Sequence, residues 1–137
     1  MFNLSIVTPE KIFYENKVAS LIAPGIEGYL GVLTNHAPLI TAITPGKVTV
    51  KNESDEVIIM SVSEGFLEVS GNTATLLVDA VEYASDIDLD RAKEAIERAT
   101  RRMSDKAGNI DIPRLRKAVE RAKNRLRIAS EIGRAHV

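Results

Sequence analysis

The sequence predicts an α+β protein, with an antiparallel β-sandwich or barrel over residues 1–84 and a C-terminal antiparallel two-helix hairpin over residues 85–137. Three observations support this division. All six aromatic residues precede residue 84, every arginine lies beyond residue 90, and the hydrophobic period changes from two to a helical period at the acidic segment 85–90. Side-chain charges add up to −6 before this segment begins and to +5 from residue 85 onward. We therefore expect two physically different units, with a function that depends on both.

The first unit reads as a series of short strands. Phe2, Leu4 and Ile6 alternate with polar residues, and such alternation is typical of a half-buried strand. Further apolar runs occur at residues 18–23, 48–50, 57–62, 66–69 and 74–78, and turn signals separate them at 8–9, 24–25, 45–46, 52–55 and 70–72. These spacings are too short for crossover helices, which predicts antiparallel pairing.

The second unit reads as a helical hairpin. Asp88 is expected to cap the first helix, residues 108–109 to end it, and Asp111 and Pro113 to start the second. The apolar positions form one stripe per helix, and both stripes depend on alanine: Leu89, Ala92, Ile96, Ala99 and Met103 in the first helix, Leu115, Ala118, Ala122, Leu126 and Ala129 in the second. Alanine buries little area, so the stripes contribute only a few kcal/mol at about 25 cal/mol per Å². Either the hairpin opens readily or alanine simply allows close helix packing.

Composition excludes several classes of protein. The chain has no cysteine, so disulfides and thiolate metal sites are absent, and a reducing cytosol fits best. No apolar run approaches the roughly 18–20 residues that span a bilayer, and no basic region precedes the first apolar stretch. We expect a soluble, untargeted chain without direct membrane insertion. The formal net charge of −1 gives no general attraction to nucleic acid.

The residues needed for catalysis are missing. The only histidines are His36 and His136, and without cysteine no Cys–His nucleophile exists. Ser63 lies in a strand pattern rather than in the strand–turn–helix context of a nucleophile elbow. No glycine-rich loop ends in Gly-Lys-Ser/Thr, and no cluster of metal ligands stands out. We predict a non-catalytic protein without a metal or a required cofactor.

The glycine-rich segment 25–39 is expected to be a shaped surface loop between strands. Its glycines permit positive φ, and Tyr29 and His36 offer an amphipathic contact surface. A simple turn at a barrel corner is an equal alternative.

Within each predicted helix, two arginines are spaced so that they lie on the same helix face. Arg91 and Arg98 are seven residues apart, and Arg121 and Arg125 are four apart. If these pairs converge in a hairpin, four guanidinium groups suit a polyphosphate, because they bind phosphate oxygens bidentately and keep their charge. The alternative is an ordinary solvated helix surface.

Several segments together resemble the epsilon subunit of the F-type ATP synthase, of the bacterial type. They are Leu-Ser-Ile-Val-Thr-Pro at 4–9, Leu-Gly-Val at 30–32, His-Ala-Pro-Leu at 36–39, Gly-Phe-Leu-Glu-Val at 65–69, Ile-Asp-Leu-Asp-Arg-Ala at 87–92 and Arg-Ala-Lys-Asn-Arg-Leu at 121–126. The resemblance covers nearly the whole chain, and the order and spacing of the segments make it specific. Glu64 departs from the pattern, since the family often has glycine beside Gly65.

The resemblance implies a rotor subunit at the cytoplasmic face of the bacterial plasma membrane. In that family the β-domain binds the gamma subunit and the c-subunit ring, so Glu27, Tyr29 and His36 are expected in the contact loop. In one state of these subunits the hairpin is folded. In another state it extends along gamma and inhibits ATP hydrolysis, and its basic helices then approach acidic surfaces of the alpha and beta subunits. Rotation of the ring then drives ATP synthesis.

The resemblance also implies a regulatory ATP site at the folded hairpin, as in several bacterial members. The matching positions here are Glu82, Ile87, Asp88, Arg91, Ala92, Arg98, Arg121 and Arg125. A free-standing RNA-binding module that uses the basic hairpin is the rival interpretation, but it requires stacking aromatics beside the arginines, and no aromatic residue follows Tyr83. An independent ATPase would need a phosphate loop, which the sequence lacks.

Overall fold

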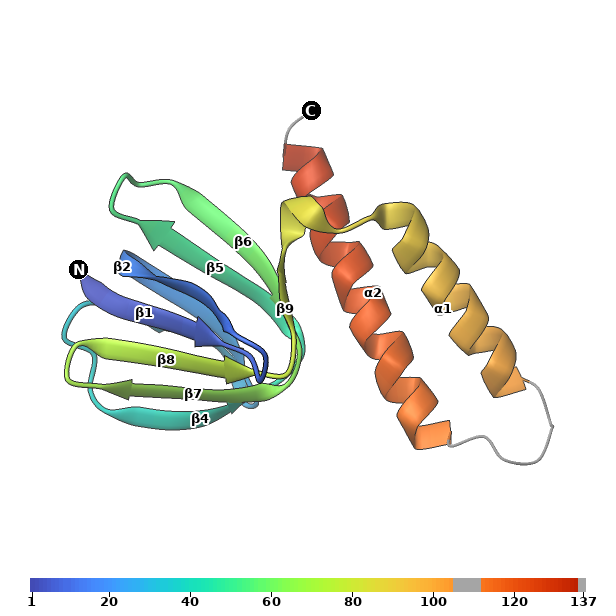
Figure 1. The fold of residues 1–137 in the computed structure, drawn as a ribbon, viewed down its shortest axis with the longest axis horizontal. Coiled ribbons are helices and arrows are strands. Elements are labelled where there is room, and N and C mark those ends of the chain that lie inside the picture. The colour runs from blue at the N-terminus through green and yellow to red at the C-terminus, as the bar shows by residue number, and fades with distance from the viewer. Residues whose placement is uncertain (105–111, 136–137) are drawn as a thin grey trace. The chain divides into compact units, whose positions relative to one another are not determined.

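The computed structural model describes residues 1–104 and 112–135. The chain divides into two compact units, Met1–Tyr83 and Ala84–Val137. Among the described residues, the first unit is a sheet of nine strands and the second contains a short 3-10 helix and two α-helices (Figure 1). The elements are β1 (Phe2–Val7), β2 (Ile12–Gly25), β3 (Gly28–Val32), β4 (Leu39–Ile43), β5 (Gly46–Asn52), β6 (Val57–Val62), β7 (Gly65–Ser70), β8 (Thr73–Val78), β9 (Val81–Tyr83), η1 (Ala84–Asp86), α1 (Leu89–Ser104) and α2 (Ile112–Ala135). The predicted fold class is therefore confirmed.

The long strand β2 joins the layers of the sandwich. Its first half pairs with β1, its second half pairs with β3 and β5, and its last residue also pairs with β4. The register shifts between Val18 and Ser20, an irregularity of the kind that bends a strand. Strands β1, β8, β7, β4 and β2 consequently form a closed circuit, and β5, β6 and β9 continue from β2.

The core of the sandwich confirms the alternation seen in the sequence. Phe2, Leu4 and Ile6 are buried, whereas Asn3 between them is exposed. The same cluster contains Leu67 and other aliphatic side chains from strands β2 to β8, many of them without measurable exposure. Each such side chain stabilises the fold by about 1.5–3 kcal/mol through burial, so the strand pattern is set by which residues face this core.

One strand pair differs from the antiparallel pattern predicted. β1 and β8 are parallel, with Asn3 opposite Thr73 and Val7 opposite Leu77. Two parallel strands that follow each other directly in the sequence need a long crossover connection between them. Here six other strands lie between β1 and β8 in the sequence, and the chain returns beside β1 only after them. Short connections therefore do not exclude a parallel pair between distant strands.

A cluster of aromatic residues lies beside the core. The rings of Phe13 and Tyr83 are tilted, with centroids 4.8 Å apart. The hydroxyl of Tyr14 is buried and has no hydrogen-bond partner among the described residues. Burial raises the pKa of the Tyr14 phenol, and the neighbouring Tyr83 raises it further. A buried hydroxyl without a hydrogen-bond partner costs about 1–3 kcal/mol of stability.

In the helical unit, α1 and α2 lie side by side and antiparallel, and α2 also packs against η1 (Figure 1). Pro113 lies in the first turn of α2, as predicted, while residues 105–111, including the predicted stop at 108–109 and Asp111, lie outside the described residues. The predicted alanine stripe of α2 is partly wrong: Ala118 is exposed, and Val119 and Ile128 are buried. The stripe prediction assumed that one face of α2 packs, but the residues buried on α2 lie on two faces. The helical unit therefore buries larger side chains than alanine.

Candidate functional sites

The start of α1 is organised by Asp88. Its Oδ1 atom accepts a hydrogen bond of 3.1 Å from the backbone N–H of Arg91, and its carbonyl oxygen accepts one of 3.0 Å from Ala92 N–H. Asp88 is thus the N-cap that the sequence predicted. The flanking residues Ile87 and Ala92 are buried, so in this structure their side chains serve packing. This cap fixes where the side chain of Arg91 leaves the helix.

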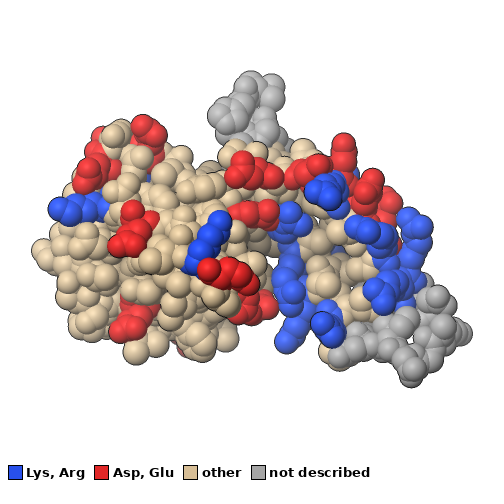
Figure 2. All heavy atoms as spheres, in the orientation of Figure 1, with Lys and Arg blue, Asp and Glu red and all other residues tan. Residues whose placement is uncertain are grey.

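The four arginines of the predicted phosphate site are distributed over both α-helices. Arg91 and Arg98 are exposed on α1, Arg121 is exposed on α2, and Arg125 is half-buried on α2. Figure 2 shows lysine and arginine side chains gathered over the helical unit, whereas the visible face of the sandwich carries mostly acidic charges. Their convergence on one ligand stays a prediction.

Sequence reasoning missed a polar side chain on α2. Asn124 is buried to 6% exposure, and its Oδ1 atom accepts a hydrogen bond of 2.8 Å from Arg127 Nη2. A polar residue with weak helix propensity inside an otherwise charged segment was the available signal. It lies next to Arg125, so this part of α2 has a fixed polar arrangement rather than a freely solvated surface.

Glu82 belongs to the other unit. It lies in β9, opposite Ser61 of β6, and is half-buried. The remaining predicted nucleotide residues belong to the helical unit. A shared site of Glu82 with those residues stays a prediction.

The segment 25–39 is not a single loop, which corrects the prediction. Strand β3 occupies Gly28–Val32 and pairs with the second half of β2, and β4 begins at Leu39. Glycines at two of its five positions interrupt the alternation of apolar and polar side chains in β3, so the sequence pattern does not identify this strand and its pairing with β2 does. Glu27 is exposed in the turn before β3, and His36 is half-buried in the connection after it, so the two lie at opposite ends of this strand.

The connection after β3 is held at the N-terminal end of β1. The Met1 amino group donates to Thr34 Oγ1 at 2.9 Å, and Asn35 N–H donates to Asn72 Oδ1 at 3.4 Å. His36 Nδ1 lies 2.6 Å from the carbonyl oxygen of Ala37, and since a carbonyl only accepts, this nitrogen carries the proton. His36 is therefore presented by a local backbone arrangement distinct from that of Glu27.

The side chain of Tyr29 is fixed by a hydrogen bond within the sandwich. Its hydroxyl oxygen accepts a hydrogen bond of 3.1 Å from the backbone N–H of Lys47 at the start of β5. The residue as a whole is nevertheless 56% exposed.

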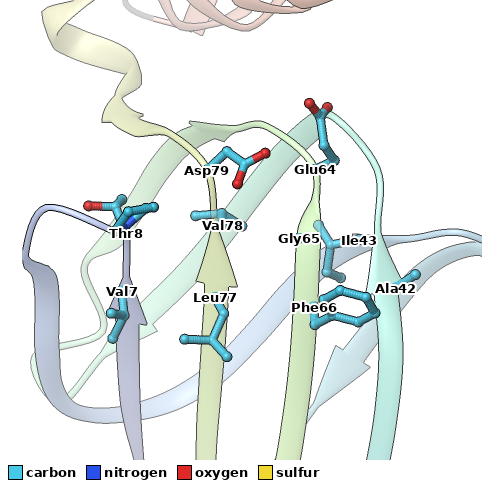
Figure 3. A pocket seen from close by; sticks show the side chains of 11 residues that line it. Val7, Thr8, Ala42, Ile43, Glu64, Gly65, Phe66, Leu77, Val78 and Asp79 are labelled. Carbon is cyan, nitrogen blue, oxygen red and sulfur yellow. The ribbon is translucent and has the colours of Figure 1, made fainter.

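A hollow of about 580 Å³ opens on the outer face of the sheet formed by β1, β8, β7 and β4 (Figure 3). Ala42, Phe66, Leu77 and Val7 are cross-strand neighbours in this order and form an apolar row. Figure 3 shows the carboxylates of Glu64 and Asp79 at one end of the hollow. The lining residues are Val7, Thr8, Pro9, Ala42, Ile43, Glu64, Gly65, Phe66, Leu77, Val78 and Asp79.

The apolar row is open to solvent. Phe66 is 57% exposed, Leu77 is also exposed, and Ile40, two residues before Ala42 on the same face of β4, is more exposed still. Residues 66–69 and 74–78 are recognisable as strands from the sequence, but this surface is not, because the register of four strands decides which residues meet. A hollow with an apolar floor and two acidic groups at its rim suits an apolar side chain next to a basic one.

In the described part of the chain, no group of three or more histidine, aspartate or glutamate residues is arranged to hold a metal ion. Within the same residues, no helix is long and apolar enough to cross a membrane.

Comparison with known proteins gives consistent similarities. The profile for the ATP synthase, Delta/Epsilon chain, beta-sandwich domain matches residues 1–84, and that for the corresponding long alpha-helix domain matches residues 85–130. The ATP synthase epsilon chain of Moorella thermoacetica is 44% identical over 104 residues, which cover 76% of this chain and 78% of the relative. That of Desulforamulus reducens is 40% identical over 126 residues, covering 92% and 95%.

Solved structures share the fold at lower identity. A chain in the Euglena gracilis mitochondrial ATP synthase structure, which contains OSCP, F1 and the c-ring, aligns with a TM-score of 0.77 at 21% identity, covering 88% of this chain and 76% of that one. A chain in the central stalk and c-ring structure from Tetrahymena thermophila aligns with a TM-score of 0.54 at 16% identity, covering 95% and 94%.

Proposed function

Because this chain belongs to the ATP synthase delta/epsilon chain family, we propose that it couples rotation of the c-subunit ring to ATP synthesis as part of the central stalk. It is a non-catalytic subunit of the complex, as are the epsilon chains to which it is related. The proposed location is the cytoplasmic face of the bacterial plasma membrane, where the subunit is peripheral and attached through its partners.

The observation that carries this proposal is the open apolar hollow. An exposed apolar surface rimmed by polar or charged residues is typical of a protein-interaction site. We assign the hollow to the gamma subunit, with an apolar side chain of gamma seated on Phe66 and Leu77 and a basic side chain near Glu64 and Asp79. Stable docking on gamma is what torque transmission requires.

Phe66→Ser is expected to weaken binding of the purified gamma subunit by about ten- to a hundredfold, because burying a phenylalanine contributes about 1.5–3 kcal/mol. The measurement is a surface-binding titration of both variants at equal salt. Val57→Ser is the matched control, since Val57 is 60% exposed on β6, away from the hollow. Equal losses for the two variants would contradict docking at the hollow.

The helical unit is proposed to inhibit ATP hydrolysis when it extends toward the alpha and beta subunits. Its net charge of +5 complements acidic surfaces on such partners. Inhibition is therefore expected to require the helices and not the sandwich.

Deleting residues 86–137 is expected to raise the ATP hydrolysis rate of the assembled enzyme severalfold and to leave proton pumping per ATP largely unchanged. The sandwich retains the hollow and segment 25–39, which are the proposed contacts with gamma and the ring. Hydrolysis and pumping would be measured on membranes in which the truncated subunit is detected by immunoblot. An unchanged hydrolysis rate would remove the inhibitory role.

ATP is proposed as a regulatory ligand of the folded helical unit, and no cofactor is required. The cap at Asp88 supports this, because it orders the first turn of α1 where Arg91 stands. A ligand that binds only the folded form stabilises it by RT ln(1 + [L]/Kd), which would make the inhibitory state sensitive to ATP concentration.

A further inference from the structure

The turn between β2 and β3 is tied to a distant part of the sandwich. Ile26 N–H donates to the carbonyl oxygen of Ala42 at 3.0 Å, and Thr44 N–H donates to that of Pro24 at 2.9 Å. These bonds join the turn to the end of β4. The bond from Lys47 N–H to Tyr29 Oη, at 3.1 Å, adds a third attachment at the start of β5.

The bond made by Tyr29 differs from the other two because a side chain makes it. The regular pairing of β2 with β5 ends at Ile22 opposite Thr49, two residues short of Lys47. The Tyr29 hydroxyl supplies an acceptor beyond this point. A single phenolic oxygen therefore connects β3 to β5 beyond the end of the β2–β5 backbone ladder.

Two glycines allow this close approach. A β-carbon on Gly46 would lie 2.6 Å from Pro24 Cβ and 3.0 Å from the Tyr29 hydroxyl oxygen. A β-carbon on Gly25 would lie 2.9 Å from the carbonyl oxygen of Gly28, within the turn itself. Such distances are shorter than side chains tolerate, so the packing of the turn on the β4–β5 connection depends on Gly46, and the tightness of the turn depends on Gly25.

These three hydrogen bonds hold the short tip of the β2–β3 turn, residues 26–27. Ile26 is 65% exposed, and Glu27 next to it is exposed as well. Gly28, which follows, has a φ of 128°, a conformation that ends the turn and that other residues rarely adopt. The tip thus presents one apolar and one acidic side chain from a backbone fixed at several points.

We infer that Tyr29 is a positioning residue: its hydroxyl clamps the β2–β3 turn so that Ile26 and Glu27 form a stiff contact point for the c-subunit ring. This inference rests on the proposed function and revises the expected role of Tyr29, which was contact alone. A contact in a rotor transmits force only if it does not bend under load. Loss of the Tyr29–Lys47 hydrogen bond is expected to make the turn more flexible, while Ile26 and Glu27 remain in place to touch the ring.

The clamp is tested first on the isolated chain with Tyr29→Phe, which keeps the ring and removes the oxygen. Amide hydrogen exchange of Lys47, followed by NMR, is expected to accelerate by about three- to tenfold, the consequence of losing one ordinary hydrogen bond. Tyr14→Phe is the matched control, because the Tyr14 hydroxyl has no partner among the described residues. Equal exchange at Lys47 in Tyr29→Phe and in the wild type would overturn the clamp.

The positioning role is tested in the assembled enzyme carrying the same two variants. Tyr29→Phe is expected to lower proton pumping per ATP hydrolysed while the subunit stays bound at wild-type level, and Tyr14→Phe to leave pumping unchanged. Faster exchange at Lys47 with full pumping would overturn the positioning role. If the wild-type chain itself neither assembles nor supports pumping, the proposed function fails, and the exchange measurement still decides the clamp.

Discussion

Gly65→Ala is expected to destabilise the sandwich by about 3 kcal/mol or more, at the upper end of the cost of overpacking a tightly packed site. A β-carbon at this position would overlap the carbonyl oxygen of Leu77 and lie 2.8 Å from Val78 Cα. Both obstacles are backbone atoms of β8, so no rotation of a side chain relieves them. Urea unfolding followed by circular dichroism measures the change.

Gly71→Asn is the control for this experiment. Gly71 lies in the turn between β7 and β8 with a φ of 56°, and a β-carbon there meets no atom within 4 Å. Asparagine tolerates this conformation, so the expected cost is below about 1 kcal/mol. Similar costs for the two substitutions would show that the approach of β7 to β8 at Gly65 is not what limits stability.

Truncating an arginine of the proposed nucleotide site is expected to weaken ATP binding by about ten- to a hundredfold. A hydrogen bond to a charged group contributes about 1.5–3 kcal/mol, and each guanidinium is expected to bind phosphate oxygens. Calorimetric titration of the purified chain with ATP would compare Arg91→Ala and Arg125→Ala with the wild type. Asp88 and Glu82 are expected near the adenosine end of the nucleotide or bonded to the arginines.

Lys93→Ala is the control, because Lys93 is exposed on α1 and lies on the opposite side of the helix from Arg91 and Arg98. Its loss is expected to leave the affinity nearly unchanged. Equal losses at all three positions would indicate diffuse charge attraction, and a wild-type chain that does not bind millimolar ATP would exclude the site.

Local sequence determined the features that depend on neighbouring residues. The alternation of Phe2, Leu4 and Ile6 predicted a strand whose apolar side is buried, because side chains alternate along a strand wherever it lies. Asp88 was predicted as a helix cap and is one, because its carboxylate bonds the N–H only three residues later. The family, too, was recognisable from short segments in a fixed order.

Tertiary structure decided the features that depend on residues distant in sequence. The parallel pairing of β1 with β8, the strand β3 and the burial of Val119 and Ile128 all come from contacts that no local pattern contains. The hollow exists because four strands align Ala42, Phe66, Leu77 and Val7 in one row. The clamp joins Tyr29 to Lys47 across 18 residues. Hydrophobic periodicity shows that a residue faces a core or solvent, but strand register decides which exposed residues meet, and register is set by the whole sheet.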